Sequence, residues 1–256
     1  MTLSALVLTP RRQSPWILAV AALVEVVLDL ANGLHLAAAL GFALANTAEP
    51  LVGAVLLRRR VGGQVRLLRH RDALAYFSYG VLAAPVVGGL IGATTVYLGQ
   101  HRPWVDAFLS FWAGDGLGVL TVGGAVLTWR YLRPVSQRSV IKPLLVVMAT
   151  VAVTMAGFWP SEVPLFYLPV PLLFWVAFRF PVAVMAACGL LMTVTANVMT
   201  SAGSGPWASL ASTPQLETAT LQLFMGTTVA GAWFLAVSIA ERDSPGRRHP
   251  PSVRSG

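Results

Sequence analysis

The sequence predicts an all-α integral membrane protein, a polytopic bundle of about eight transmembrane helices. Of its 256 residues, 56% are hydrophobic and 11% are charged, whereas soluble domains average about 25% charged residues. Apolar runs long enough to cross a bilayer, which takes about 20 residues, recur along the chain. Lysine and arginine gather in alternate connecting segments. The single cysteine, Cys188, excludes a disulfide within the chain.

The expected membrane helices follow one another with short connections. They cover residues 15–31, 36–57, 73–99, 105–129, 143–159, 163–179, 181–200 and 218–240. The fifth and sixth runs are short, and the proline-containing turn between them predicts a tight helical hairpin. Pro164, Pro169 and Pro171 predict that the sixth helix is kinked or partly unwound, which a membrane tolerates only against protein or a water-filled cavity.

The positive charges predict the orientation. Cytoplasmic loops collect lysine and arginine, and with a cytoplasmic N-terminus only Arg102 of the 18 basic residues falls on the outer side. We therefore expect a multi-pass protein of the inner (plasma) membrane with both termini cytoplasmic. Basic residues spread over loops beside an anionic leaflet also account for the net charge of +8. This spread argues against a nucleic-acid partner.

Three parts are expected along the chain. Residues 1–14 form a cytoplasmic N-terminal segment, residues 15–241 the transmembrane domain, and residues 242–256 a disordered basic cytoplasmic tail rich in Pro, Arg, Ser and Gly. The connecting loops are too short to hold a catalytic domain. No metal-ligand or Ser-His-Asp motif is recognisable, so we expect neither an enzyme nor a bound cofactor or metal.

Polar residues inside the apolar runs are the candidate site. Glu25 and Asp29 share a face of the first helix, Asn46 and Glu49 a face of the second, and Asp115 lies in the fourth. At about 1.5 Å per residue, all except Asp29 lie roughly 15–20 Å from a span end, near the middle of a hydrocarbon core about 30 Å thick. Asp29 lies nearer the outer end, where water can reach it.

Carboxylates at this depth cost about 3 kcal/mol each, and no lysine or arginine lies at a similar depth to neutralise them. Three arrangements remain open. The carboxyl groups are protonated and cross-link helices through hydrogen bonds, or they line an aqueous cavity, or they bind a cation or a cationic ligand. Ionisable residues within a membrane usually mark a functional site, so we interpret this cluster as a site for sensing or transport.

Small and aromatic residues predict how the helices pack. Gly88 and Gly92 form a Gly-x-x-x-Gly spacing that lets helix backbones approach closely. Packing within the chain is the simpler interpretation, and a homodimer seam is the alternative. Trp207, near the end of a span, is expected to be an interfacial anchor.

Several short motifs, in order, resemble the bacterial membrane-associated sensor domain family of the first-described MASE type. The resemblance extends from about residue 16 to residue 243. Its motifs are Asn46-Thr47-x-Glu49, Gly53-Ala54-x-Leu56-Leu57-Arg58-Arg59, Trp112-x-x-Asp115-x-x-Gly118-Val119-Leu120, Gly203-x-Gly205-Pro206, Leu221-Gln222-Leu223-Phe224 and Ala240-Glu241-Arg242.

The resemblance implies a helical sensory input module, which in this family usually precedes a histidine kinase, a diguanylate cyclase or a phosphodiesterase. It also implies signal reception by Asn46, Glu49 and Asp115, whereas Glu25 and Asp29 rest on the physical argument. Pro50 stands where the family has a small helix former, so we expect a kink there. Against the family pattern, we expect the chain to lack a leading helix or pair of helices with a Trp-Pro-x-x-Gly stretch and to lack an output domain after Arg242.

We therefore expect a stand-alone sensor that perceives a ligand, an ion or a proton at its intramembrane polar cluster. Such a module signals through a partner kinase or a cyclic-nucleotide-signalling protein. The alternative is a small secondary transporter or channel that uses the same carboxylates as an ion or substrate site beside the broken sixth helix.

Overall fold

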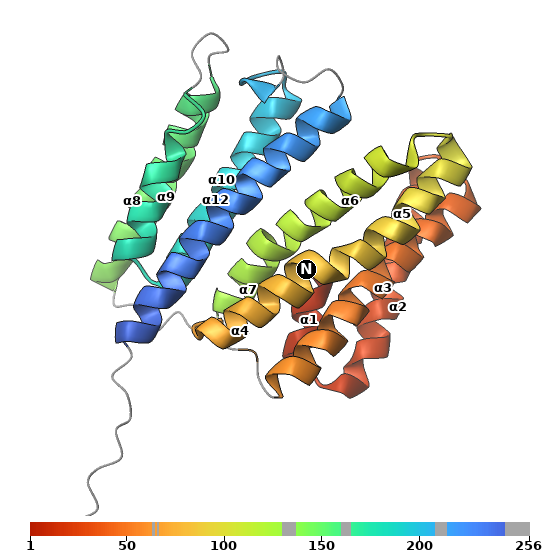
Figure 1. The fold of residues 1–256 in the computed structure, drawn as a ribbon, viewed down its shortest axis with the longest axis horizontal. Helices are drawn as coiled ribbons and strands as arrows, with labels where there is room; N and C mark the ends of the chain where they lie inside the picture. Colours follow the sequence, from red (N-terminus) through yellow and green to blue (C-terminus); the bar gives the residue numbers. More distant parts are fainter. Residues whose placement is uncertain (63–64, 66, 130–136, 160–164, 208–213, 244–256) are drawn as a thin grey trace, which may run out of the picture.

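The chain folds into a bundle of helices (Figure 1). The structure, a computed structural model, describes residues 1–62, 65, 67–129, 137–159, 165–207 and 214–243. Every regular element in these residues is helical, and seven helices are long and apolar enough to cross a membrane. The predicted fold class, a polytopic helical membrane bundle, is confirmed.

The first half of the bundle contains four of the long membrane helices. The first is α2 (Ser14–Ala31), preceded by the 3-10 turn η1 (Arg11–Gln13), and the second is α3 (Leu36–Val61). The third is a continuous rod made of α4 (His70–Ala75), η2 (Tyr76–Ala83) and α5 (Ala84–Gln100). The fourth joins α6 (Trp104–Gly118), η3 (Val119–Gly123) and α7 (Gly124–Trp129).

The second half consists of α8 (Gln137–Phe158), α9 (Pro169–Arg179), α10 (Val182–Ser201) and α12 (Pro214–Asp243). In space the long helices follow the order α2, α3, α5, α6, α12, α10 and α8, and α9 packs on the last three. The expected sixth span differs from the others, because α9 has only 11 residues. Pro169 and Pro171 lie in its first turn, where a missing N–H costs least.

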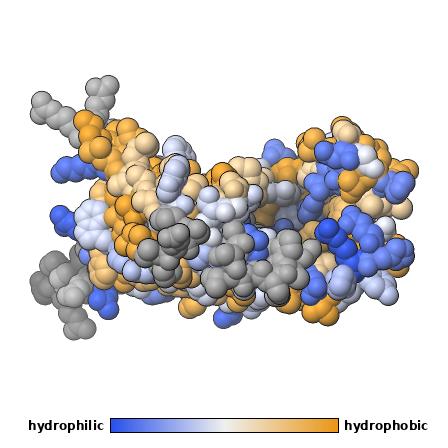
Figure 2. All heavy atoms as spheres, turned by 90° about the horizontal axis from the view of Figure 1, so that it is seen from above, coloured by the Kyte–Doolittle hydropathy of each residue, from blue (hydrophilic) through white to orange (hydrophobic). Residues whose placement is uncertain are grey.

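The bundle is apolar both inside and outside. Buried side chains between α10 and α12 include Met185, Met192 and Met225. Large apolar side chains such as Leu23 and Val198 are exposed on the outside, and hydrophobic residues cover broad stretches of the surface in Figure 2. Because water would penalise this exterior, the exposed faces of the helices are surfaces for lipid. The protein is a multi-pass membrane protein.

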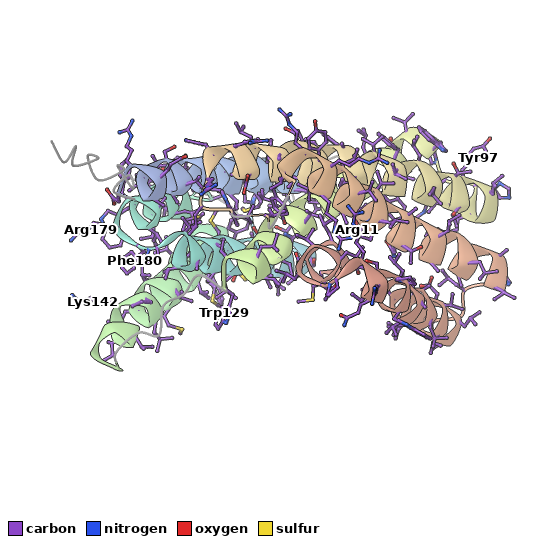
Figure 3. All side chains as sticks on the ribbon, turned by 90° about the horizontal axis from the view of Figure 1, so that it is seen from below. Arg11, Tyr97, Trp129, Lys142, Arg179 and Phe180 are labelled. Carbon is purple, nitrogen blue, oxygen red and sulfur yellow. The ribbon has the colours of Figure 1, made fainter. Side chains whose placement is uncertain are left out.

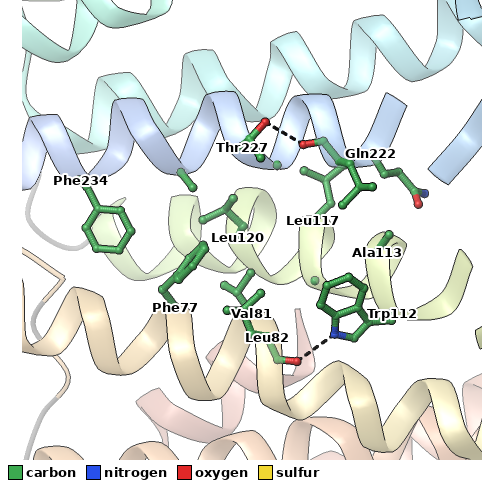
Figure 4. A pocket seen from close by; sticks show the side chains of 14 residues that line it. Phe77, Val81, Leu82, Trp112, Ala113, Leu117, Leu120, Gln222, Thr227 and Phe234 are labelled. Carbon is green, nitrogen blue, oxygen red and sulfur yellow. Dashed lines mark hydrogen bonds between the residues drawn. The ribbon is translucent and has the colours of Figure 1, made fainter. Parts of the chain in front are cut away.

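Two helices contain π-helical segments, which the sequence did not reveal. In η2 and η3 the backbone turns are widened, and side chains of neighbouring helices bind carbonyl groups there. Tyr76 donates its hydroxyl proton to the carbonyl of Val119, and Trp112 Nε1 donates to the carbonyl of Leu82 at 3.0 Å. Figure 4 shows the second of these bonds. These bonds satisfy polar backbone groups that lipid could not satisfy.

A short helix, α1 (Thr2–Leu8), is inserted among the membrane helices. Residues 1–14 were expected to be a cytoplasmic segment, but Leu3, Ser4 and Leu6 are buried in the bundle. Ser4 Oγ donates to the carbonyl of Gly123 at 3.1 Å. The guanidinium of Arg58 donates to the carbonyls of Leu6 and Thr9, which satisfies the C-terminal end of α1.

Trp207 is an internal residue, so its expected role as an interfacial anchor is wrong. It is buried and stacks on Phe158 with ring centroids 5.7 Å apart, and its ring meets Phe166 edge-on at 4.8 Å. The turn before it depends on Gly203 and Gly205, whose φ angles of +78° and +86° favour glycine. The aromatic cluster thereby holds this turn against the bundle.

Two other expectations concern chain ends and helix breaks. Helix α3 continues through Pro50 from Leu36 to Val61, and α12 continues to Asp243. The rest of the predicted tail, from residue 244, and the hairpin turn from residue 160 lie outside the described residues. Lys142 and Arg179 lie towards one end of the molecule and Tyr97 at the opposite end (Figure 3).

The close contact between Gly124 and Trp233 gives a test of how the two halves pack. A Cβ on Gly124 would lie within 2.3 Å of the Trp233 ring, so Gly124→Ala should lower the free energy of unfolding by about 1–3 kcal/mol through overpacking. The measurement is thermal unfolding in detergent. The control is Gly226→Ala in α12, where no described heavy atom lies within 4 Å of the added carbon. Equal melting temperatures for Gly124→Ala and Gly226→Ala would contradict the close packing of Gly124 against Trp233.

Candidate polar site within the membrane

Four polar side chains from three helices line one cavity of about 260 Å³. Glu25 comes from α2, Asn46 and Glu49 from α3, and Asp115 from α6. Four of the five residues that the sequence singled out therefore meet. The other lining residues are small or apolar: Met1, Thr2, Leu3, Ala21, Pro50, Gly114, Gly118 and Val119.

The side chains form two pairs, and the first, which is hydrogen-bonded, joins α2 to α3. Asn46 Nδ2 donates to Glu25 Oε1 at 2.6 Å. A hydrogen bond that involves a carboxylate is shorter and stronger than one between neutral groups. The amide of Asn46 thus gives Glu25 a partner, although no basic side chain was found at this depth in the sequence.

The second pair joins α3 to α6. Glu49 is only 6% exposed, and its carboxyl group lies within side-chain hydrogen-bonding reach of the Asp115 carboxyl group. An ionised carboxylate is only an acceptor, so a hydrogen bond between the two forms only when one of them holds a proton. A proton can therefore bridge two helices here.

Small residues make room for Glu49. A Cβ on Gly88 of α5 would lie 2.5 Å from Glu49 Oε2, so only glycine fits at that position without moving the carboxyl group. Pro50 lines the same cavity. Because proline has no N–H, the carbonyl of Asn46 lacks its usual helical donor, and an additional acceptor lies on this turn of α3.

Gly92 and Asp29 have different surroundings. A Cβ on Gly92 would lie 3.1 Å from the Phe111 ring, so the Gly-x-x-x-Gly segment of α5 contacts α3 at one glycine and α6 at the other.

Asp29 does not line the cavity. Its Oδ2 is buried and has no hydrogen-bond partner among the described residues.

The wall formed by α1 was missed from the sequence. Met1, Thr2 and Leu3 close one side of the cavity. A run of seven mostly apolar residues carries no signal that distinguishes an inserted helix from a surface segment. The only hint is Arg58, which ends the second apolar run and binds the carbonyls at the end of α1.

A second, apolar cavity of about 360 Å³ lies beside the polar site, between η2, α6, η3 and α12 (Figure 4). Gln222 of α12 lines it and lies close to Gly114, where a Cβ would be 3.2 Å from Gln222 Nε2. Gly114 precedes Asp115 and also lines the polar cavity. Helices α6 and α12 therefore touch directly beside the polar site but are loosely packed along the groove.

Among the described residues, no group of three or more His, Cys, Asp or Glu side chains is arranged to hold a metal ion. The polar site instead offers two pairs that join helices, the hydrogen-bonded Asn46–Glu25 pair and the facing carboxyl groups of Glu49 and Asp115. With the α-amino group of Met1 beside these two carboxyl groups, such a site can exchange a proton or accept a further small positive charge between Glu49 and Asp115. Either change would alter the contact between α3 and α6.

Comparison with known proteins assigns the chain to a family. No curated protein and no solved structure matches it. A model of the MASE1 family matches residues 1–243, which includes all the motifs quoted above. The chain therefore belongs to the MASE1 family of membrane-associated sensor domains.

Proposed function

We propose that the protein is a sensory input module whose signal is a positive charge, a proton or a small cation, at the Glu49–Asp115 pair. The meeting of Glu25, Asn46, Glu49 and Asp115 in one cavity carries this proposal. MASE1 domains are sensory rather than catalytic, in agreement with a site built for binding. Occupancy of the pair selects between two packings of α3 and α6.

The route from the site to an output runs through α12. Asp115 and Gly114 are neighbours on α6, and Gly114 touches Gln222 of α12. A shift of α6 therefore acts directly on α12, and the apolar groove beside this contact leaves α12 room to move. The last turns of α12 carry Ser238 and Glu241, which meet the start of α4.

Contacts at this end hold α12 to the first half of the bundle. Glu241 Oε2 accepts a hydrogen bond from the backbone N–H of His70 at 3.1 Å, and Ser238 Oγ lies 2.9 Å from His70 Nε2. Movement of α12 would change these contacts at the arginine-rich end. We place this end, with the C-terminus and the connection between α1 and α2, on the cytoplasmic side of the inner membrane, where a histidine kinase or a cyclic-nucleotide-signalling protein would receive the signal.

Replacing Glu49 tests the site. The Gln amide can donate to Asp115 without a bound proton, so we expect Glu49→Gln to abolish the difference between acid and alkaline buffer in the protection factors of the Ser238–Glu241 amides, that is, in hydrogen–deuterium exchange corrected for the intrinsic rate. A coupling free energy of about 1–3 kcal/mol between the site and α12 corresponds to a change of about 5-fold or more in the wild-type protection factors. The variant should lose this change. The measurement uses the protein in lipid nanodiscs. Asp29→Asn is the control, because Asp29 lies outside the cavity, and it should keep the wild-type response.

The same variants separate sensing from transport. In proteoliposomes, the wild-type protein should show pH-dependent protection of the α12 amides against hydrogen–deuterium exchange. It should show no saturable flux of protons or small cations. Saturable flux that Glu49→Gln abolishes would contradict the sensor and favour the transporter.

Gly88→Ala should disturb the pair without changing any charge. The added methyl group would displace Glu49 Oε2, since its carbon would lie 2.5 Å away, so the variant should resemble Glu49→Gln in the exchange experiment. Gly99→Ala, on the same helix, meets no described heavy atom within 4 Å and should behave as wild type. A normal response in Gly88→Ala would show that the Glu49–Asp115 contact is not the switch.

Topology is tested with reporter fusions. Fusions in the 62–69 connection and after Asp243 should report the cytoplasm, and a fusion at His101 should report the outer side. A reporter in the 62–69 connection that is active outside would overturn the proposed orientation.

A further inference from the structure

A third cavity, of about 500 Å³, connects the polar site with the end of the bundle opposite the arginine-rich loops. Its residues include Arg102 and Asp106 at that end and Ser110 and Asp115 deeper in α6. Asp115 also lines the polar cavity, so this residue borders both spaces. From Asp106 to Asp115 the cavity follows nine residues of helix, or about 13 Å.

The lining of this cleft becomes less exposed with depth. Asp106 is exposed, whereas Ser110 and Asp115 are half-buried. Ser110 Oγ donates to the carbonyl of Asp106 at 2.8 Å, so its hydroxyl oxygen can still accept a hydrogen bond from water. The volume greatly exceeds the ~30 Å³ of one water molecule, and charged groups at both ends make it hospitable to water.

Phe111 separates the cleft from the surrounding helices. Its ring packs against Gly92 of α5 and lies 6.0 Å from the Phe42 ring of α3. Phe111 and Asp115 are one turn apart on α6, and Phe42 and Asn46 are one turn apart on α3. The aromatic pair therefore lies one turn outward of the polar site, at the inner end of the cleft.

We propose that this cleft is a water-filled entrance through which the signal, a proton or a small hydrated cation, reaches Asp115 from the outer side of the membrane. The inference rests on the proposed function for the role of Asp115, but the path itself is independent of signalling. Arg102 and Asp106 offset each other's charge at the mouth, so the acidic group of Asp115 at the inner end favours a cation over an anion along the path. The sensor would thus report conditions outside the cell.

The experiment is thiol labelling of single-cysteine variants in sealed right-side-out vesicles. Cys188 is the single cysteine of the chain, so Cys188→Ala gives a background without thiols. In this background Ser110→Cys should react with a membrane-impermeant cationic methanethiosulfonate, and faster than with an anionic reagent of similar size. Leu109→Cys is the matched control, since Leu109 is one residue away and 43% exposed but does not line the cleft.

We expect Ser110→Cys to react at least about tenfold faster than Leu109→Cys, whose thiol lies in lipid and stays largely protonated. Adding Asp115→Asn should reduce the preference for the cationic reagent. Equal rates at the two positions, or reaction of Ser110→Cys only with reagent on the cytoplasmic side, would overturn the entrance. Ala107→Cys, which lines the same cleft, replaces Ser110→Cys should that variant fail to fold, as judged by labelling in detergent.

Failure of the entrance and failure of the sensor give different results. Labelling of Ser110→Cys from outside together with an unchanged response in Glu49→Gln would leave the entrance in place and remove the sensory site. Absence of labelling together with a lost response in Glu49→Gln would keep the site and exclude this path.

Discussion

The requirement that a carboxyl group in hydrocarbon must have a partner organises the first half of this protein. Each unpaired charge near the bilayer centre costs about 3 kcal/mol, and here the carboxyl groups find partners on other helices. Glu25 binds Asn46, and Glu49 faces Asp115. Because each pair crosses a helix boundary, α2, α3 and α6 are tied together by polar contacts at this depth, while apolar packing forms the core of the bundle. Under the proposed function, a change in protonation at Glu49 and Asp115 would change how α3 and α6 pack.

The residues around these pairs follow from the same need to keep buried carboxyl groups paired and away from lipid. Gly88 leaves space for the Glu49 carboxyl group, and Gly114 lets Gln222 of α12 approach beside Asp115. Inserted helix α1 closes the cavity on another side, and Arg58 holds its end. The site is thus bounded by parts of the chain that are far apart in sequence. Their common feature is that each leaves room for a polar group or shields it from lipid.

The fold class and most of the site could be predicted because both depend on one-dimensional properties. Apolar run length determines which segments can cross a bilayer, and counting residues along a helix places Glu25, Asn46, Glu49 and Asp115 at a common depth. What could not be predicted depends on contacts between distant segments. The insertion of α1, the burial of Trp207 and the carbonyl groups bound in η2 and η3 all require the neighbouring helix to be known. Asp29 shows the limit of helix-face reasoning, since it shares a face with Glu25 but does not line the cavity.

The position of Asp115 gives the arrangement a direction. Asp115 lines both the cleft that leads from the end opposite the arginines and the cavity that holds Glu49. Its backbone neighbour, Gly114, meets the helix that ends at Glu241 and binds the start of α4. One turn of α6 therefore borders the proposed entrance, the polar pair and helix α12. Rigid helices transmit small displacements along their length, so a shift of this turn would reach the arginine-rich end through α12 without any further moving part.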